Sequence, residues 1–217
     1  MSQPKITLYV DIVSPFAYIA FYILKNSPVF KQCEITYIPI LLGGLMKACG
    51  NTAPINIKNK DKWINAERHR WATHFQIPIS ATPPPGFPVN TLNIQRALVS
   101  LSLSHPDKLE HAIALFYEAF WVRWDEPTRP EKIHSVLTTV LGSGEEADKV
   151  MQAEGVKGVL SGNTEKAFRD GAFGLPWFVA TNKAGETEGY WGVDHMGQMC
   201  DHLGLDRPTG KGWRSLL

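Results

Sequence analysis

Cysteine is scarce in this chain, which limits the redox and metal chemistry that the protein can perform. The cysteines Cys33, Cys49 and Cys200 lie far apart, and no Cys-x-x-Cys pair is present. A two-cysteine disulfide-exchange motif and a cysteine zinc site both need closer spacing. Three separated cysteines indicate free thiols in a reducing compartment. None of the seven histidines has other metal-ligand residues spaced around it, so we predict no metal site.

The sequence also lacks an excess of charge and a long apolar run. Its formal net charge is +1, from 22 basic and 21 acidic residues, which does not favour nucleic acid as a partner. No apolar run approaches the roughly 20 residues of a membrane span. Residues 1–5 lead directly into a predicted strand, so we expect no targeting leader. At 217 residues the chain can form one large domain, or one domain with a sizeable insertion.

Residues 11–18 mark a change from strand to helix. Ile6–Val10 is short, apolar and β-branched, as in a buried strand. Pro15 suits the first turn of a helix, so Ser14 should lie at the junction. Free backbone N–H groups and the helix dipole favour an anion there, and such a place lowers the pKa of a thiol. The alternative role for Ser14 is a simple helix N-cap.

The rest of the chain predicts strand, helix, strand, then a helical block, then strand, strand, helix. The predicted elements are a helix from Pro15 to about Asn26, a strand at 34–40, a short helix at 41–48, a loop at 51–61, a helix from Trp63 to about Gln76, an extended loop at 82–88, helices opening near Asn90, Pro106 and Pro130, helices at 145–154 and 163–171, strands at 176–181 and 187–191, and a helix at 195–203. We expect the tail from Arg207 to be loosely held.

This pattern predicts an α/β protein of the thioredoxin-like fold with an inserted all-helical domain, the DsbA-like arrangement. Residues 1–60 and 172–217 would form the thioredoxin-like domain, and residues 61–171 the inserted domain. The first two strands should be parallel with a right-handed crossover. The short turn at 182–185 should make the last two strands antiparallel.

Leu175 and Pro176 stand where the third strand begins. A proline is structurally permitted at a strand start. In thioredoxin-like folds this proline is cis and lies beside the helix N-terminus that holds the sulfur chemistry. We therefore expect a cis Leu175–Pro176 bond. Leu175 would then offer its backbone N–H and C=O to an extended, peptide-like ligand.

Other polar and aromatic residues each have a structural and a functional interpretation. Asp194 is either the N-cap of the last helix or a carboxylate that takes the amino group of a ligand. Asn51 and Lys60 are either solvated loop residues or groups that hold an amide and a carboxylate. Five aromatic side chains are expected in the helical core, with one or two lining a pocket for a second substrate: Trp63, Trp71, Phe116, Trp121 and Trp124.

Five segments taken in order resemble the class kappa glutathione transferases. They are Asp11-Ile12-Val13-Ser14-Pro15-Phe16, Leu45-Met46-Lys47-Ala48-Cys49-Gly50-Asn51, His74-Phe75-Gln76-Ile77-Pro78-Ile79, Gly171-Ala172-Phe173-Gly174-Leu175-Pro176 and Gly192-Val193-Asp194-His195-Met196. They span nearly the whole chain. The bacterial 2-hydroxychromene-2-carboxylate isomerases look like close relatives on the same scaffold.

The resemblance implies a homodimer that uses glutathione as co-substrate, with no metal. It implies that Ser14 stabilises the glutathione thiolate and that Leu175, before Pro176, pairs with the cysteinyl backbone. It implies that Asn51 and Lys60 hold the glycyl end of glutathione. Asp194 and the N–H groups beside it, including that of Val193, would hold the γ-glutamyl end. The family usually has Gly-Ser-Asp-Arg at the last motif. Val193 therefore lacks a hydroxyl, and His195 lacks a permanent charge at neutral pH.

We accordingly expect a glutathione transferase that detoxifies small hydrophobic electrophiles. A glutathione-dependent isomerase is the first alternative. A thiol–disulfide oxidoreductase would need a cysteine in place of Ser14, and a non-catalytic glutathione-binding module is the third possibility. The expected compartment is the cytoplasm, or by resemblance the mitochondrion or peroxisome, although Ser215-Leu216-Leu217 only poorly approximates a peroxisomal address.

Overall fold

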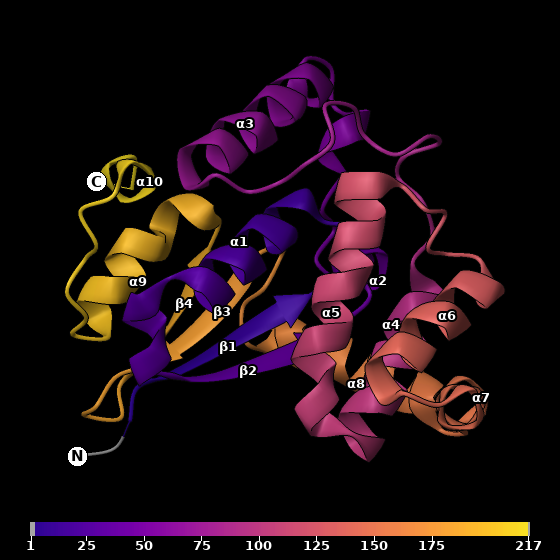
Figure 1. Cartoon of the computed structure of the whole chain (residues 1–217). Coiled ribbons are helices and arrows are strands. Elements are labelled where there is room, and N and C mark those ends of the chain that lie inside the picture. Colours follow the sequence, from indigo (N-terminus) through magenta and orange to yellow (C-terminus); the bar gives the residue numbers. More distant parts are fainter. Residues whose placement is uncertain (1–2, 217) are drawn as a thin grey trace.

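A four-stranded sheet forms the centre of the computed structural model, which describes residues 3–216 (Figure 1). Its strands, in the order β2-β1-β3-β4, are β1 (Lys5–Val10), β2 (Glu34–Pro39), β3 (Trp177–Thr181) and β4 (Thr187–Trp191). β1 and β2 are parallel and are joined through α1 (Pro15–Asn26), whereas β3 is antiparallel to both β1 and β4. This topology confirms the thioredoxin-like prediction.

A block of helices separates β2 from β3 in the sequence. It comprises α2 (Leu42–Ala48), α3 (Lys60–Phe75), α4 (Leu92–Ser104), α5 (Leu109–Glu118), a π-helical segment (Ala119–Arg123), α6 (Pro130–Leu141), α7 (Gly144–Gln152) and α8 (Val156–Arg169). Residues 61–171 are all described and contain no strand, which confirms the helical insertion. The domain boundaries at 60/61 and 171/172 stay a prediction. α8 begins seven residues earlier than we expected, because Gly158 and Gly162 hide its helical pattern.

One continuous core joins the sheet to the inserted helices. Leu8 of β1 is fully buried, as is Tyr117 of α5. The Tyr117 ring lies 5.2 Å from the ring of Tyr18 and 5.5 Å from that of Phe21, both on α1. Each such buried side chain contributes about 1.5–3 kcal/mol. The first helix of the thioredoxin-like unit is thus packed directly against the insertion.

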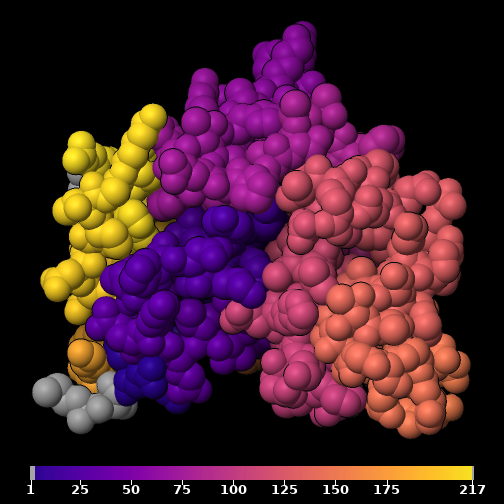
Figure 2. Space-filling model, viewed as in Figure 1, coloured from indigo at the N-terminus to yellow at the C-terminus, as the bar shows by residue number. Residues whose placement is uncertain are grey.

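The C-terminal tail is held more firmly than we predicted. After α9 (Met196–His202), Arg207 forms an ion pair with Asp201, and α10 (Lys211–Arg214) follows. The Trp213 ring is 7% exposed and lies 5.7 Å from the Phe30 ring and 5.8 Å from the Phe75 ring. Figure 2 shows the yellow C-terminal segment seated against α3. The prediction was wrong because it was based on the prolines and glycines of this segment and did not include the burial of the Trp213 side chain in the core.

Residues 3–216 contain neither a helix that could span a membrane nor a cluster of metal-binding side chains. No helix among them is both long and apolar enough to cross a bilayer. Nor do they hold a group of three or more histidine, cysteine or acidic side chains arranged to bind a metal ion. Met1, Ser2 and Leu217 lie outside the described residues, and Leu217 is the last residue of the address-like terminal tripeptide.

Candidate active site

The turn between β1 and α1 is built around the buried side chain of Asp11. The Asp11 carboxylate is 1% exposed, and its Oδ1 accepts hydrogen bonds from the Thr91 hydroxyl at 2.6 Å and from the Val13 N–H at 3.1 Å. Its Oδ2 accepts the Leu42 N–H at 2.8 Å. Burial raises the pKa of Asp11, and the hydrogen bonds, that from Thr91 foremost, oppose the rise. One side chain therefore fixes the turn relative to the starts of α2 and α4.

Two side chains of the helical insertion hold the same turn from the other side. Gln95 is fully buried in α4, and its Nε2 donates to the carbonyls of Val10 at 2.8 Å and Ile40 at 2.7 Å. Gln95 Oε1 accepts the Ile12 N–H at 3.4 Å. Trp121 Nε1 donates to the Ile12 carbonyl at 2.8 Å. Backbone groups that would otherwise be buried without partners are thereby satisfied.

Ser14 has the N-cap geometry that its position before Pro15 indicates. It is 4% exposed with extended backbone angles, φ −89° and ψ 114°. Its Oγ accepts the Ala17 N–H at 3.1 Å. An oxygen that accepts at the cap keeps its own hydrogen, and no described residue accepts that hydrogen. The capping role is therefore confirmed, and it leaves the hydroxyl able to donate to an anion.

Leu175 and Pro176 lie at the edge of the same turn. The Leu175–Pro176 bond is cis, as predicted. The β1–β3 register pairs Tyr9 with Trp177, so its continuation brings Pro176 opposite Val10 and Leu175 beside the turn. Among the described residues, neither the N–H nor the C=O of Leu175 has a hydrogen-bond partner. Leu175 thus has the free donor and acceptor that an added extended peptide requires.

Asn51 reaches the loop that precedes Leu175, whereas Lys60 does not. Asn51 Nδ2 donates to the Phe173 carbonyl at 2.7 Å, and Cys49 Sγ lies 3.7 Å from the same oxygen. Lys60 was expected in a loop, but it is the first residue of α3 and is exposed. Among residues 3–216, no hydrogen bond or ion pair joins the Lys60 side chain to Ser14, Leu175 or Asn51.

The segment with Val193 and Asp194 lies beside Pro176, because the Gly192 N–H donates to the Pro176 carbonyl at 3.1 Å. Asp194 does not cap a helix, so that prediction was wrong. Gly192 has φ +91°, and a 3₁₀ turn, Val193–His195, delays the start of α9 to Met196. The Asp194 carboxylate is 62% exposed, with Oδ2 3.5 Å from His195 Nδ1, whereas Val193 is buried.

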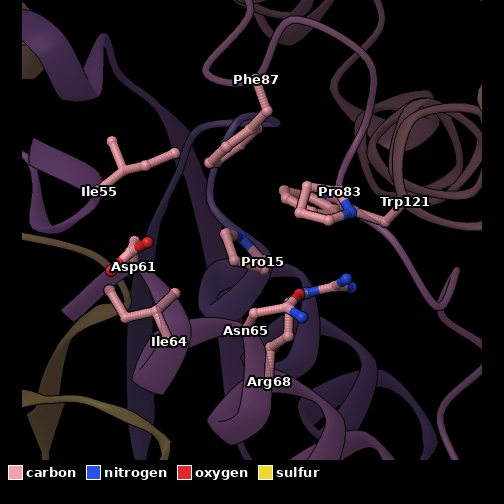
Figure 3. Close-up of a pocket in the computed structure, with 9 residues that line it drawn as sticks. All are labelled: Pro15, Ile55, Asp61, Ile64, Asn65, Arg68, Pro83, Phe87 and Trp121. Carbon is pink, nitrogen blue, oxygen red and sulfur yellow. Dashed lines mark hydrogen bonds between the residues drawn. The ribbon is translucent and has the colours of Figure 1, made fainter. Parts of the chain in front are cut away.

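A small cavity of about 50 Å³ lies beside Pro15, the residue that follows Ser14 (Figure 3). Pro15 forms one wall, α3 another, and the loop before α4 a third. The apolar lining residues are Pro15, Ile55, Ile64, Pro83, Phe87 and Trp121, and the polar ones are Asp61, Asn65 and Arg68. The cavity lies between the first helix of the thioredoxin-like unit and the insertion, where a second substrate was expected.

The aromatic residues divide between core, pocket and surface. Trp121 is buried and lines the cavity, and Phe116 is fully buried in the core. Trp71 and Trp124 are partly buried against the core. Trp63 is 54% exposed, so its expected core position was wrong. It lies on the side of α3 that faces solvent.

Three buried polar residues, Asp11, Gln95 and Arg68, were not predicted from the sequence to have a role in building the site. Arg68 is 1% exposed, and its guanidinium lies 5.7 Å from the Trp121 ring. A signal existed for Gln95, a polar residue on the apolar face formed by Ile94 and Leu98. Apart from Val13 for Asp11 and Asn65 for Arg68, their side-chain hydrogen-bond partners lie 12 or more residues away in the sequence, which is why a local pattern did not find them.

Comparisons with known proteins agree with this fold. The profile of the DSBA-like thioredoxin domain matches residues 5–204, so the chain belongs to that family. Glutathione S-transferase kappa 1 of Homo sapiens is 30% identical over 211 residues, covering 92% of this chain and 90% of the human one. Within the DsbA-like proteins, the chain therefore belongs to the class kappa glutathione transferases and is an enzyme of that class.

The isomerase relatives also match over most of their length. The 2-hydroxychromene-2-carboxylate isomerase of Sphingobium xenophagum is 24% identical over 200 residues, covering 91% of this chain and 97% of that protein. A solved structure of a 2-hydroxychromene-2-carboxylate isomerase has a TM-score of 0.76 at 20% identity, covering 92% of this chain and 94% of that one. The human transferase and the Sphingobium isomerase together support transferase activity or a related isomerase activity.

Proposed function

We propose that this protein conjugates the thiolate of glutathione to small hydrophobic electrophiles, and that Ser14 stabilises that thiolate. The observation that carries the proposal is the Ser14 hydroxyl. It accepts from the Ala17 N–H and keeps its own hydrogen for a donor bond at the N-terminus of α1. A free thiol titrates near 8.5, and a helix N-terminus with one donor lowers that pKa by roughly one to two units.

Glutathione would lie along the turn with its cysteinyl backbone paired to Leu175. Asn51, whose amide already contacts the Phe173 carbonyl, and Lys60 would hold the glycyl end. The carboxylate of Asp194 would take the γ-amino group, and the Val193 N–H the γ-glutamyl carboxylate. The exposure of Asp194 supports this assignment, since an exposed carboxylate remains accessible to a ligand.

The electrophile would occupy the cavity lined by Pro15 and Trp121, adjacent to the thiolate. Its mostly apolar lining favours small hydrophobic compounds, which fits a role in detoxification. A homodimer is part of this proposal through the family. The cytoplasm is the proposed compartment, with the mitochondrion or peroxisome as the alternative suggested by the family.

The test is the titration of bound glutathione in the wild type and in Ser14→Ala. Glutathione binding should remain largely intact, because most contacts come from other residues. The thiolate absorbance should shift to higher pH by roughly one to two units, since a hydrogen bond to a charged group contributes about 1.5–3 kcal/mol. Activity at pH 7 should fall about 10- to 100-fold and partly recover at higher pH.

Ser143→Ala is the matched control. Ser143 caps α7 in the same way, with its side chain accepting the Glu146 N–H at 3.3 Å. Both variants lose one helix cap, at a cost of about 1 kcal/mol. Only Ser14→Ala should move the thiol titration. Superimposable curves and equal activities for all three proteins would restrict Ser14 to its capping role. Superimposable curves with activity lost only in Ser14→Ala would indicate positioning of the thiolate.

The second candidate is a glutathione-dependent isomerase, which the match to the isomerase of Sphingobium xenophagum over 91% of this chain supports. In that reaction glutathione adds to a conjugated substrate and leaves again, so the product has the mass of the substrate. Mass analysis of the product separates the two functions. A conjugate heavier by one glutathione supports transfer.

A further inference from the structure

The orientation of the Asn65 side chain is fixed by the buried Arg68. Arg68 Nε donates to Asn65 Oδ1 at 2.9 Å. Arginine has no acceptor, so the Asn65 atom facing it must be the oxygen. Arg68 itself is held by bonds from Nη1 to the Ser80 carbonyl at 2.9 Å and from Nη2 to the Ala81 carbonyl at 3.1 Å. The amide of Asn65 is therefore turned by a side chain that is itself locked.

This orientation leaves the amide nitrogen of Asn65 with two unused donors. No residue in 3–216 accepts a hydrogen bond from Asn65 Nδ2, and this nitrogen is not among their buried unpartnered atoms, so it is accessible to a ligand. Asn65 is partly buried and lines the cavity together with Pro15, the residue next to Ser14 (Figure 3). Most of the lining is apolar, and the two other polar lining groups, Asp61 and Arg68, carry opposite charges. The amide is thus the neutral, directional donor of the pocket.

We propose that Asn65 is a specificity-determining residue that donates a hydrogen bond to the electrophile, and that the pocket selects electrophiles whose reacting carbon is conjugated to a carbonyl or nitro oxygen. This inference rests on the proposed transferase function and deepens it. A positioned donor in a mostly apolar pocket distinguishes substrates that can accept its hydrogen bond from those that cannot.

The hydrogen bond from Asn65 should be strongest in the transition state of the addition. The thiolate sulfur attacks the β-carbon of an unsaturated ketone, forming the C–S bond. The π electrons of the C=C bond move toward the carbonyl, and the oxygen becomes an enolate oxyanion. A proton from water then adds to the α-carbon and completes the conjugate. Because the oxygen becomes negative, Asn65 Nδ2–H would bind the transition state more strongly than the ground state.

The test compares two aromatic electrophiles of similar size in three variants. Benzylideneacetone has the conjugated oxygen, and benzyl chloride, which reacts by displacement of chloride, does not. Asn65→Asp is isosteric and keeps an oxygen for Arg68 but has no N–H donor. Asn65→Leu removes both. Lys62→Gln, an exposed change two residues after Lys60 on α3, is the control and should leave both rates unchanged.

In both Asn65 variants, the ratio of kcat/KM for benzylideneacetone to kcat/KM for benzyl chloride should fall about 10- to 100-fold. Rates are compared at a pH where the bound thiol of each variant is fully ionised, which removes any effect of the introduced carboxylate on the thiol pKa. A ratio that does not change in Asn65→Asp would overturn the inference and leave Asn65 as a structural partner of Arg68.

The two proposals fail in different ways. A wild type that conjugates both electrophiles with a ratio unaffected by the Asn65 variants rejects the role of Asn65 alone. A wild type that binds glutathione but conjugates neither electrophile rejects the transferase proposal, and the Asn65 proposal with it.

Discussion

The two ends of the proposed glutathione site are constructed differently. At the sulfur end, the turn before Ser14 is buried, and the side chains of Asp11, Gln95 and Trp121 bind its backbone. At the γ-glutamyl end, Val193–His195 forms one 3₁₀ turn with no side-chain cap, and the Asp194 carboxylate is 62% exposed.

This difference separates two tasks that a glutathione enzyme must perform. The sulfur end is rigid before any ligand arrives, as expected where a charge must be stabilised without reorganisation. The γ-glutamyl end has groups that a ligand must order on binding, so its contribution to affinity is reduced by that cost. Substitutions at the first end should therefore change stability and ionisation, whereas substitutions at the second should change glutathione affinity.

The largest expected effect is that of Gln95→Leu on stability. The change leaves the Ile40 carbonyl and the Ile12 N–H buried without their partner, whereas the Val10 carbonyl still accepts the Ile40 N–H. At about 1–3 kcal/mol per unsatisfied group, the free energy of unfolding should fall by roughly 2–6 kcal/mol. Urea unfolding measures it. Gln198→Leu, an exposed change on α9, is the control and should shift stability by less than about 0.5 kcal/mol. A loss of similar size in both variants would contradict the rigid sulfur end.

A smaller effect is expected from Asp11 on the pH dependence of stability. Burial raises the folded-state pKa of Asp11 above its unfolded value of about 3.9. The folded protein thus holds this proton more tightly, and the stabilisation is complete below the unfolded pKa. It is lost as the pH rises through the folded pKa, with a slope of at most about 1.4 kcal/mol per pH unit.

Asp11→Asn should remove that slope, because asparagine does not titrate. Urea unfolding at a series of pH values above about 4 measures the slope. The exposed Asp206→Asn is the control and should alter it much less. Stability that rises with pH in this window in the wild type, and no longer does so in Asp11→Asn, would mean that the hydrogen bonds to Asp11 outweigh its burial.

The difference between local contacts and long-range hydrogen bonds also explains which parts of the site could be predicted from the sequence. Ser14 and Pro176 were recognisable because strand, turn and helix signals lie within a few residues of each. Gln95 and Arg68 were missed, since the backbone carbonyls that they bind, 12 or more residues away, are brought near only by the folded chain. Asp194 was assigned to a cap because a local pattern contains no information on the positive φ of Gly192, which delays the helix. Local geometry was thus predictable, whereas buried long-range hydrogen bonds were not.

The smallest expected effect concerns His195, at the γ-glutamyl end. His195→Arg introduces a permanent charge beside Asp194, where the related transferases have arginine. The site is solvent-exposed, so the gain should be about 0.2–1 kcal/mol, up to roughly fivefold tighter glutathione binding by calorimetry. The gain should shrink at high salt, since exposed charges are screened. Asp194→Asn, as a comparison, should weaken binding, because it removes the proposed partner of the γ-amino group. Glutathione binding that is unchanged in both variants would mean that the γ-glutamyl group binds away from Asp194 and His195. The proposed contacts at the sulfur end would then remain, and those at the γ-glutamyl end would be rejected.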